Sequence, residues 1–219
     1  MKEKSVWAVI AAFNEEKRIE KVIEGTMPYV DHLVVVDDGS VDKTFEVASK
    51  KTTTLQHDVN MGKGAALKTG CDYAVDHGAE YIIVLDADCQ HDPREIPRFL
   101  DALTDVDIVF GYRKLNEHMP AILRFGNWVI NTITKILYGM SMRDTQSGYR
   151  AFRAQIYPKI RWEAVDYSME SEMIARVGSH HFRFKEIPIE TIYGDRYKGT
   201  TVIDGMKIVF NLFWWKLAK

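Results

Sequence analysis

The feature that most constrains the fold is a short apolar run that ends directly in acidic residues. Residues 81–85 are Tyr-Ile-Ile-Val-Leu, Asp86 and Asp88 follow, and Pro93 closes the segment. A run of this length that is rich in β-branched residues and bounded by a breaker is typical of a buried strand. Because side chains alternate along a strand, Asp86 and Asp88 are expected on the same side of its carboxyl end.

Further apolar runs and the helical segments between them predict the fold class. Other segments with the character of strands are residues 6–12, 33–37, 53–56 and 106–110. Helices are expected between them, over residues 15–25, 42–51, 64–78 and 94–103. Strands that alternate with helices form βαβ units, so we predict an α/β fold with a mostly parallel sheet. Such sheets bind ligands at the carboxyl ends of their strands.

Length and composition favour one folded domain over residues 1–219. The chain is 46% hydrophobic with a net charge of −2, so it has a core and no electrostatic footprint for nucleic acid. Its two cysteines, Cys71 and Cys89, cannot form a disulfide framework, which favours a reducing compartment. No signal peptide is expected, and no apolar run reaches the roughly 18 residues that span a bilayer.

The second half has a different pattern. Residues 118–140 place apolar side chains at helical spacing, and residues 202–219 mix aliphatic and aromatic side chains with Asp204, Lys207 and Lys216. Both segments suit amphipathic helices at a membrane interface, while packing on the domain or at a dimer contact remains the alternative for the second. Between them we expect a turn-rich loop, a late strand and a basic loop, at residues 144–152, 182–189 and 193–199.

Two features of the first half have a chemistry of their own. A pair of carboxylates at the mouth of a parallel sheet forms a hard oxygen site that suits Mg²⁺ or Mn²⁺ carrying phosphates, unless both acids are simply solvated. Lys63 lies between two glycines before a helix, where it can reach a diphosphate with the help of backbone amides. The loop is not a Walker A motif, and no G-x-G-x-x-G follows the first strand, which argues against a dinucleotide enzyme.

Taken in order, these segments resemble the inverting family 2 glycosyltransferases of GT-A fold. Within that family they look most like the polyprenyl-phosphate hexosyltransferases, the dolichol-phosphate mannose synthase group. The resemblance covers about residues 5–200, and the chain departs from it at Phe13, where Tyr is usual, and at Tyr112, where Ser is usual. The matching motifs are Ala-Ala-Phe-Asn-Glu at 11–15, Val-Asp-Asp-Gly-Ser-Val-Asp-Lys-Thr at 36–44, Asn-Met-Gly-Lys-Gly at 60–64, Asp-Ala-Asp-Cys-Gln at 86–90, Gly-Tyr-Arg at 111–113 and Asp-Thr-Gln-Ser-Gly-Tyr-Arg at 144–150.

The resemblance implies a site for a nucleotide sugar, either GDP-mannose or UDP-glucose. Phe13, Glu15 and Asp38 would line the nucleoside pocket. Adjacent residues of a strand point apart, so at most one of Asp37 and Asp38 faces that pocket, and the resemblance favours Asp38. The full set of donor-binding candidates is Ala11, Phe13, Glu15, Val36, Asp38, Lys63, Asp86 and Ala87.

The resemblance also implies a divalent cation. Asp88 is the first choice of ligand, Asp86 contacts the ribose and is a second metal candidate, and Gln90 lies close to it. As a Lewis acid, Mg²⁺ or Mn²⁺ would offset the charge that develops on the departing nucleoside diphosphate.

The acceptor decides the subclass. A sugar hydroxyl needs a base to take its proton, whereas a phosphate is already ionised and needs cations to hold it. By resemblance Arg113, Arg124 and Arg196 serve a lipid phosphate, and Arg150 is a further candidate in this half. Asp144 is the base if the reaction requires one, which makes Asp88, Arg113 and Asp144 the catalytic candidates.

The resulting expectation is an enzyme that moves a hexose to a polyprenyl phosphate, with residues 1–112 for the donor and residues 113–219 for the acceptor. We expect it on the cytoplasmic face of the membrane as a peripheral protein; its oligomeric state is left open. The alternatives are transfer to a sugar hydroxyl, a sugar-1-phosphate nucleotidyltransferase, and a catalytically silent binding module. A nucleotidyltransferase would have a glycine-rich basic loop after the first strand, and residues 11–24 contain no glycine.

Overall fold

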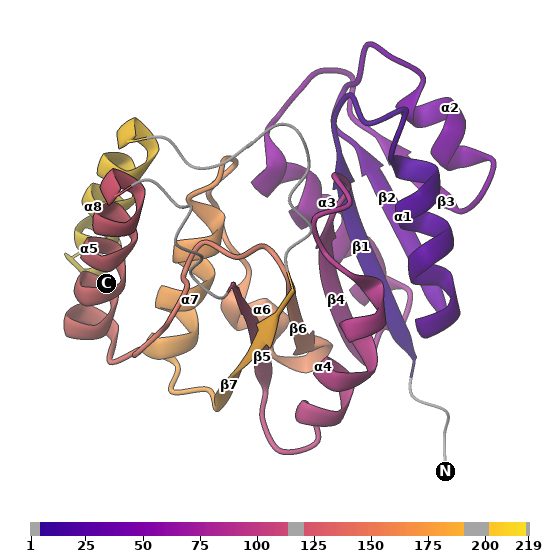
Figure 1. The fold of residues 1–219 in the computed structure, drawn as a ribbon. Helices are drawn as coiled ribbons and strands as arrows, with labels where there is room; N and C mark the ends of the chain where they lie inside the picture. Colours follow the sequence, from indigo (N-terminus) through magenta and orange to yellow (C-terminus); the bar gives the residue numbers. More distant parts are fainter. Residues whose placement is uncertain (1–4, 114–120, 191–201, 218–219) are drawn as a thin grey trace.

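The computed structural model describes residues 5–113, 121–190 and 202–217, except for the side chains of residues 121–125, 127 and 202–204. The described strands form a seven-stranded sheet in the order β3-β2-β1-β4-β6-β5-β7 (Figure 1). β6 runs antiparallel to β4 and β5, and the other neighbouring strands are parallel. The strands are β1 (Val6–Ala12), β2 (His32–Asp37), β3 (Thr53–Gln56), β4 (Tyr81–Asp86), β5 (Ile108–Arg113), β6 (Arg150–Arg153) and β7 (Phe184–Ile189).

Helices cover both faces of this sheet, which confirms the predicted α/β fold. One face carries α1 (Ile19–Thr26), α2 (Thr44–Ser49) and α4 (Ile96–Ala102). The other carries α3 (Lys63–Asp76), α5 (Ala121–Tyr138), α6 (Tyr157–Ile160), α7 (Met169–Ser179) and α8 (Val202–Leu217). Short 3₁₀ turns are η1 (Met27–Tyr29), η2 (Pro93–Glu95) and η3 (Ala154–Ile156).

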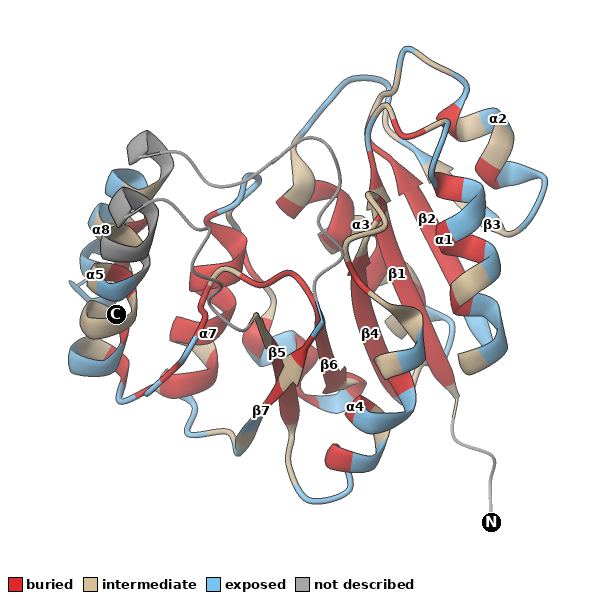
Figure 2. Cartoon of the chain, viewed as in Figure 1, coloured by how far each residue is buried: buried red, intermediate tan, exposed pale blue. Residues whose placement is uncertain are grey.

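The period of two along each strand divides the core into two layers. In β1, Trp7 and Val9 belong to the layer under α3 and α7, whereas Ala8 and Ile10 belong to the layer under α1 and α4. Both layers are buried, as the continuous red strands in Figure 2 show. Close packing of α3 requires Gly70, because a Cβ there would lie 2.4 Å from Val9 Cγ1.

Helix starts differ from the sequence prediction where a loop takes the first residues. α1 begins at Ile19 rather than near residue 15, because Asn14 has a φ of 54° and residues 13–18 belong to the loop after β1. α3 begins at Lys63, directly after Gly62 with its φ of 99°. The later start of α1 lengthens the polar loop after β1 at the carboxyl edge of the sheet, whereas α3 begins within one residue of its predicted start.

β6 was not predicted as a strand. The expected turn-rich loop over residues 144–152 ends in this short strand, which is inserted between β4 and β5. Ala151 and Phe152 are fully buried because β6 has neighbours on both sides. In the sequence, Ala151 and Phe152 lie between Arg150 and Arg153, so the apolar run is too short to indicate a strand.

α5 and α8 lie side by side at the end of the molecule opposite α1 and α2 (Figure 1). Tyr138 Oη donates a hydrogen bond of 2.7 Å to the carbonyl oxygen of Leu212, which joins the two helices. Their inward face is formed by Ile130, Ile208 and Leu212. Within the described residues, neither these nor any other helix has the length and hydropathy of a membrane span.

Candidate functional site

The loops after β1 and β2 are tied into one unit. Asn14 Oδ1 accepts the backbone N–H of Val41 at 3.0 Å, and the Asn14 N–H donates to Ser40 Oγ at 2.9 Å. The Glu15 N–H donates to Thr44 Oγ1 at 2.8 Å. Side chains of one loop therefore satisfy backbone donors of the other, which positions both before any ligand binds.

The residues that are expected to bind the nucleoside lie in these two loops or next to them. Phe13 is 40% exposed, whereas the Glu15 carboxylate is buried and paired with Arg18, whose pKa it raises. An exposed aromatic ring beside a buried, charged carboxylate is a suitable surface for a base and its ring N–H groups. Ala11 is half-buried and Val36 is fully buried, so any donor contact by Val36 comes from its backbone.

Asp38 fastens the loop that precedes α3. Its carboxylate accepts the backbone N–H groups of Met61 at 3.0 Å and Gly62 at 2.8 Å, and His57 Nδ1 lies 2.7 Å from it. The neighbouring Asp37 points elsewhere and accepts from Gln56 Nε2 at 3.1 Å. The expected divergence of the two acids is thus present. The nucleoside contact assigned to Asp38 stays a prediction, since the contacts described here hold the loop.

This loop places Lys63 at the carboxyl end of β4. Lys63 Nζ lies 2.6 Å from Asp86 Oδ1 and 3.0 Å from Glu170 Oε1. Gly148 packs against this ion pair: a Cβ there would lie 2.7 Å from Asp86 Oδ2 and 2.9 Å from Lys63 Nζ. The glycine of the Ser-Gly-Tyr-Arg motif is therefore required by close approach to charged atoms.

Asp86 and Asp88 differ in their electrostatics. Burial opposes ionisation of Asp86, but the charge and hydrogen bond of Lys63, together with the charges of His91 and Arg113, outweigh it and lower the pKa of Asp86 to about 2. Burial and the Asp86 charge raise the pKa of Asp88, whose Oδ1 accepts the Gln90 N–H at 3.0 Å. A second carboxylate whose ionisation is disfavoured by the first is a place where additional positive charge is stabilising.

The donor chemistry of Asp86, Asp88 and Gln90 fits a hard divalent cation, because all three supply oxygen ligands. The part of the chain that the structure describes contains no group of three or more His, Cys, Asp or Glu side chains arranged around a metal position. The metal site therefore stays a prediction, with Lys63 as the cation that contacts Asp86.

In the half of the chain that is expected to bind the acceptor, Arg113 and Asp144 form a forked ion pair. Arg113 Nε lies 2.7 Å from Asp144 Oδ2, and its Nη2 lies 3.1 Å from Oδ1. The buried Asp144 carboxylate also accepts the backbone N–H groups of Arg113 and Gln146, at 3.3 Å and 3.1 Å. Both oxygens are thus engaged, and proton abstraction by Asp144 would require this pair to break.

Residues 7–161 match the family model described as Glycosyl transferase family 2. The chain belongs to this family.

A UDP-N-acetylglucosamine–dolichyl-phosphate N-acetylglucosaminyltransferase of Methanococcus voltae is 30% identical to this family 2 glycosyltransferase, covering 100% of this chain and 99% of the relative. A polyprenol monophosphomannose synthase of Mycolicibacterium smegmatis is 28% identical over 94% of this chain and 83% of its own. The glucosyl-3-phosphoglycerate synthase of Mycobacterium tuberculosis, crystallised with Mn²⁺, UDP and phosphoglyceric acid, superposes with a TM-score of 0.78 at 17% identity, over 98% of this chain and 78% of that chain. The GT-A fold is thereby confirmed.

Arg150 of this glycosyltransferase does not present its donors to an acceptor. The side chain is 2% exposed, and its guanidinium donates to the carbonyl oxygens of Ser147 at 3.2 Å, Glu170 at 2.9 Å and Thr145 at 3.2 Å. Burial lowers its pKa to about 10. Because these donors hold the loop around Gly148, we leave Arg150 out of the acceptor site.

The structure does not describe the side chains of the other two acceptor candidates, Arg124 and Arg196. Arg124 lies in α5, with its side chain outside the described atoms, and Arg196 falls among residues 191–201, which are likewise outside them.

Two residues of the family 2 site were missed by the sequence analysis. His91 Nδ1 accepts the backbone N–H of Asp86 at 3.2 Å, and its ring stacks on Tyr149 at 5.0 Å, so it supports the end of β4. Burial lowers the pKa of His91, which favours the neutral ring that this contact needs. Glu170 reaches Lys63 from α7, and no local spacing signals a contact between such distant residues.

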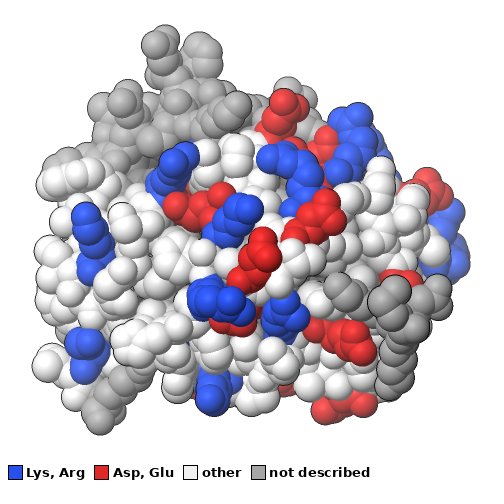
Figure 3. All heavy atoms as spheres, turned by 90° about the horizontal axis from the view of Figure 1, so that it is seen from below, with Lys and Arg blue, Asp and Glu red and all other residues white. Residues whose placement is uncertain are grey.

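α5 and α8 expose apolar side chains on their outer surface. Trp128, Ile136, Phe210 and Trp214 are 62%, 75%, 68% and 61% exposed. The spacing in the sequence predicts an apolar stripe of Ile122, Phe125, Val129, Ile133 and Ile136 along α5, and this is only partly correct. Of the members whose side chains are described, Val129 and Ile133 are half-buried and Ile136 is exposed, because the inward face is centred on Ile130 and Thr134. The described charged side chains of these helices are basic: Lys135, Lys207 and Lys216. In Figure 3 the left end of the molecule carries blue atoms and no red ones.

Proposed function

We propose that this family 2 glycosyltransferase moves a hexose from a nucleotide diphosphate sugar to a polyprenyl phosphate, with inversion. The observation that carries the proposal is the forked pair of Arg113 and Asp144. It occupies the acid that a hydroxyl acceptor would need as a base, whereas a phosphate acceptor needs none. The names of two relatives, a dolichyl-phosphate N-acetylglucosaminyltransferase and a polyprenol monophosphomannose synthase, support the same acceptor class.

The donor half, about residues 1–112, holds the nucleotide sugar in this proposal. Phe13, Glu15 and Asp38 belong to the nucleoside end, and Lys63 belongs to the diphosphate. Asp86, Asp88 and Gln90 would hold Mg²⁺ or Mn²⁺, which when bound supplies Lewis-acid stabilisation of the departing diphosphate. The donor is GDP-mannose or a UDP-sugar; the name of the archaeal relative adds UDP-N-acetylglucosamine to the candidates.

The acceptor half, about residues 113–219, brings the lipid. Arg113, Arg124 and Arg196 would bind the acceptor phosphate through charge-assisted hydrogen bonds, and Arg113 would share its guanidinium between the phosphate and Asp144. The apolar outer surface of α5 and α8 would lie on the cytoplasmic face of the membrane, with Lys135, Lys207 and Lys216 near lipid headgroups. A polyprenyl chain then stays in the bilayer while its phosphate reaches the carboxyl edge of the sheet.

A donor-by-acceptor screen tests the proposal. Purified protein with Mn²⁺ is given GDP-mannose, UDP-glucose or UDP-N-acetylglucosamine, each with a short-chain polyprenyl phosphate, the matching polyprenol or a free oligosaccharide. We expect nucleoside diphosphate release only with the lipid phosphate. Turnover with the polyprenol or the oligosaccharide, and none with the phosphate, would replace this proposal by transfer to a hydroxyl.

A further inference from the structure

The Lys63 ammonium is shared by two carboxylates that come from different halves of the chain. Its Nζ lies 2.6 Å from Asp86 Oδ1 and 3.0 Å from Glu170 Oε1. Asp86 ends β4, and Glu170 lies in the first turn of α7. The proposed function assigns Asp86 to a divalent cation. That cation would repel an ammonium on the same carboxylate, so Lys63 needs a second partner.

Glu170 can be that partner, because one of its carboxylate oxygens accepts no hydrogen bond from the described residues. Its side chain is 4% exposed, and Oε2 has no hydrogen-bond donor among the described residues. A buried carboxylate oxygen without a donor is costly, and buried polar groups are almost always satisfied. An ammonium has three N–H donors, so Lys63 is able to contact both oxygens of Glu170 once it leaves Asp86.

The surroundings restrict where Lys63 can go. The backbone at Gly148 packs so closely that a Cβ there would meet both Lys63 Nζ and the Asp86 carboxylate. The main chain before Lys63 is held by Asp38 through the N–H groups of Met61 and Gly62. With the main chain before it held and one side closed, the Lys63 ammonium keeps Asp86 and Glu170 as its carboxylate partners.

We propose that Glu170 is a positioning residue that keeps Lys63 at the donor diphosphate when a divalent cation takes over Asp86. This inference rests on the proposed function for the location of the donor site. Glu170 does not touch the reacting atoms; it holds the cation that does. No covalent bond forms or breaks in the exchange. The incoming metal replaces the Lys63 ammonium as the positive charge beside Asp86.

Calorimetry on the full chain with Mn²⁺ alone, and then with inorganic pyrophosphate in saturating Mn²⁺, tests the exchange without sugar or lipid. Lys63→Met should bind Mn²⁺ alone about tenfold more tightly, because one charge-assisted contact no longer competes for Asp86. The same variant should bind pyrophosphate about tenfold to a hundredfold more weakly, because one charge-assisted contact is lost. Lys68→Met is the matched control, since Lys68 lies on the same helix and pairs with Glu163 at 3.5 Å; it should change neither affinity.

The variants Glu170→Gln and Glu170→Asp test the role of Glu170 directly. Each should bind Mn²⁺ alone more weakly by several-fold, because Lys63 then remains on Asp86, and pyrophosphate about tenfold more weakly. In the Lys63→Met background, Glu170→Gln should cause no further loss of pyrophosphate affinity, because Glu170 acts through Lys63. A purely structural ion pair would lower the melting temperature of the Glu170 variants and leave both affinities unchanged.

The outcomes separate the inference from the proposed function. Wild-type affinities in both Glu170 variants would overturn the inference and leave the donor site intact. If the Glu170 variants do not fold, unchanged Mn²⁺ affinity in Lys63→Met overturns the inference. Wild-type protein that binds no pyrophosphate with Mn²⁺ would overturn the inference and the proposed donor site together.

Discussion

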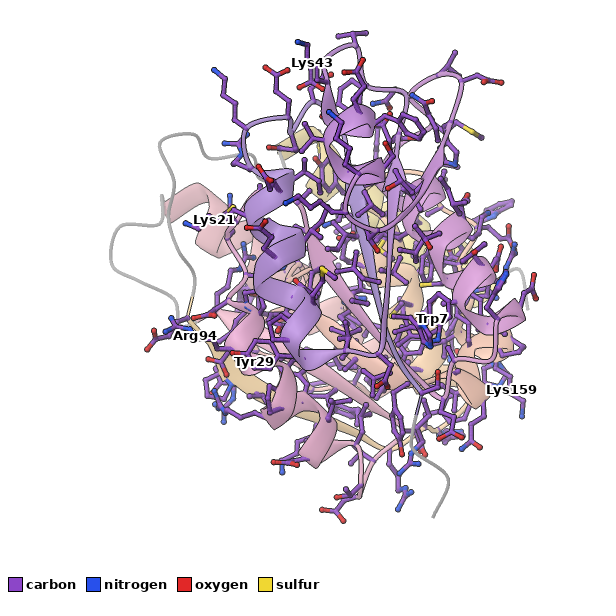
Figure 4. The ribbon with its side chains drawn as sticks, turned by 90° about the vertical axis from the view of Figure 1, so that its right-hand side faces the viewer. Trp7, Lys21, Tyr29, Lys43, Arg94 and Lys159 are labelled. Carbon is purple, nitrogen blue, oxygen red and sulfur yellow. The ribbon has the colours of Figure 1, made fainter. Side chains whose placement is uncertain are left out.

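The end of the molecule that carries α1 and α2 and the end that carries α5 and α8 are built on different principles. At the first end, polar side chains such as Asn14, Asp38 and Thr44 satisfy backbone donors of neighbouring loops. The exposed side chains of α1 and α2 are polar, and Figure 4 shows Lys21 and Lys43 pointing away from α1 and from the start of α2. At the second end, helix contacts are mostly apolar, and aromatic side chains remain exposed.

Under the proposed function, this contrast corresponds to two kinds of ligand. A nucleotide sugar is small and polar, and loops that already satisfy their own hydrogen bonds lose little conformational entropy when they bind it. A long isoprenoid chain is best left in lipid, so the acceptor end needs a surface that approaches the bilayer more than it needs a deep pocket. The predictions below test this division, beginning with the largest effect.

The first prediction concerns the metal at the donor end. Asp88→Asn should reduce kcat by at least about a hundredfold, since an electrostatic contact to developing charge typically contributes 10²–10³ in rate. EDTA should abolish wild-type turnover. Steady-state kinetics with melting temperatures measure both. Asp92→Asn is the control, because Asp92 lies on the same loop and pairs with the exposed Arg94. Near-normal turnover of Asp88→Asn would remove the metal from the proposal.

The second prediction concerns the outer surface of the acceptor end. Replacing Phe210, Trp214 and Leu217 by Ser should weaken binding to anionic liposomes by about a hundredfold or more, because each apolar side chain contributes roughly 1.5–3 kcal/mol when it leaves water. Flotation measures the bound fraction. Val41→Ser is the control at the opposite end, where Val41 is 92% exposed. Wild-type protein that stays unbound at every lipid composition would make this surface a subunit contact instead.

The third prediction separates the two acceptor chemistries. Arg124→Ala and Arg196→Ala should each lower kcat/KM for the lipid phosphate by about tenfold to a hundredfold, the effect of one charge-assisted hydrogen bond. Donor binding by calorimetry should stay unchanged, and the exposed Arg94→Ala should match wild type.

Asp144 provides the competing outcome for the same experiment. If Asp144 is a general base, Asp144→Asn removes one limb of the pH–rate profile, and both arginine variants stay near wild type. That result would refute a phosphate acceptor. Loss of activity in Asp144→Asn alone is ambiguous, because the carboxylate also holds Arg113 in place.

The smallest effect concerns an ion pair that joins the two halves. Asp72 on α3 lies 2.8 Å from the Arg161 guanidinium and accepts from Tyr157 Oη at 2.8 Å. Burial opposes ionisation, but these contacts outweigh it and lower the pKa of Asp72. A lowered folded-state pKa stabilises the protein above the unfolded-state pKa, and this contribution is lost as pH falls through the folded-state value.

Asp72→Asn should therefore lower the free energy of unfolding near neutral pH by at most about 1 kcal/mol, since the pair is partly exposed. The difference from wild type should shrink below about pH 4. Urea unfolding at both pH values measures it, with the exposed Asp76→Asn as the control on the same helix. A constant difference across pH would show that packing, and not charge, is responsible.

The donor end was largely predictable from the sequence and the acceptor end was not. The apolar runs at residues 6–12, 33–37 and 81–85 are local patterns, and they predicted the main strands and their parallel arrangement. In contrast, β6 and α7 were missed. The strand character of β6 depends on neighbours from two other strands, and the role of Glu170 depends on a lysine in the other half of the chain. The inward face of α5 was misplaced because several of its faces are apolar.

The insertion of β6 between β4 and β5 has a consequence for how the chain folds during synthesis. β1, β2, β3 and β4 become neighbours as they are made, so this part of the sheet can pair early. β5 cannot pair when it is made, because both of its partners, β6 and β7, lie later in the chain. Until the ribosome has added residues 150–189, the apolar β5 has two unpaired edges and is a segment prone to aggregation. Destabilising changes in β6 should therefore reduce the yield of folded protein more than its stability.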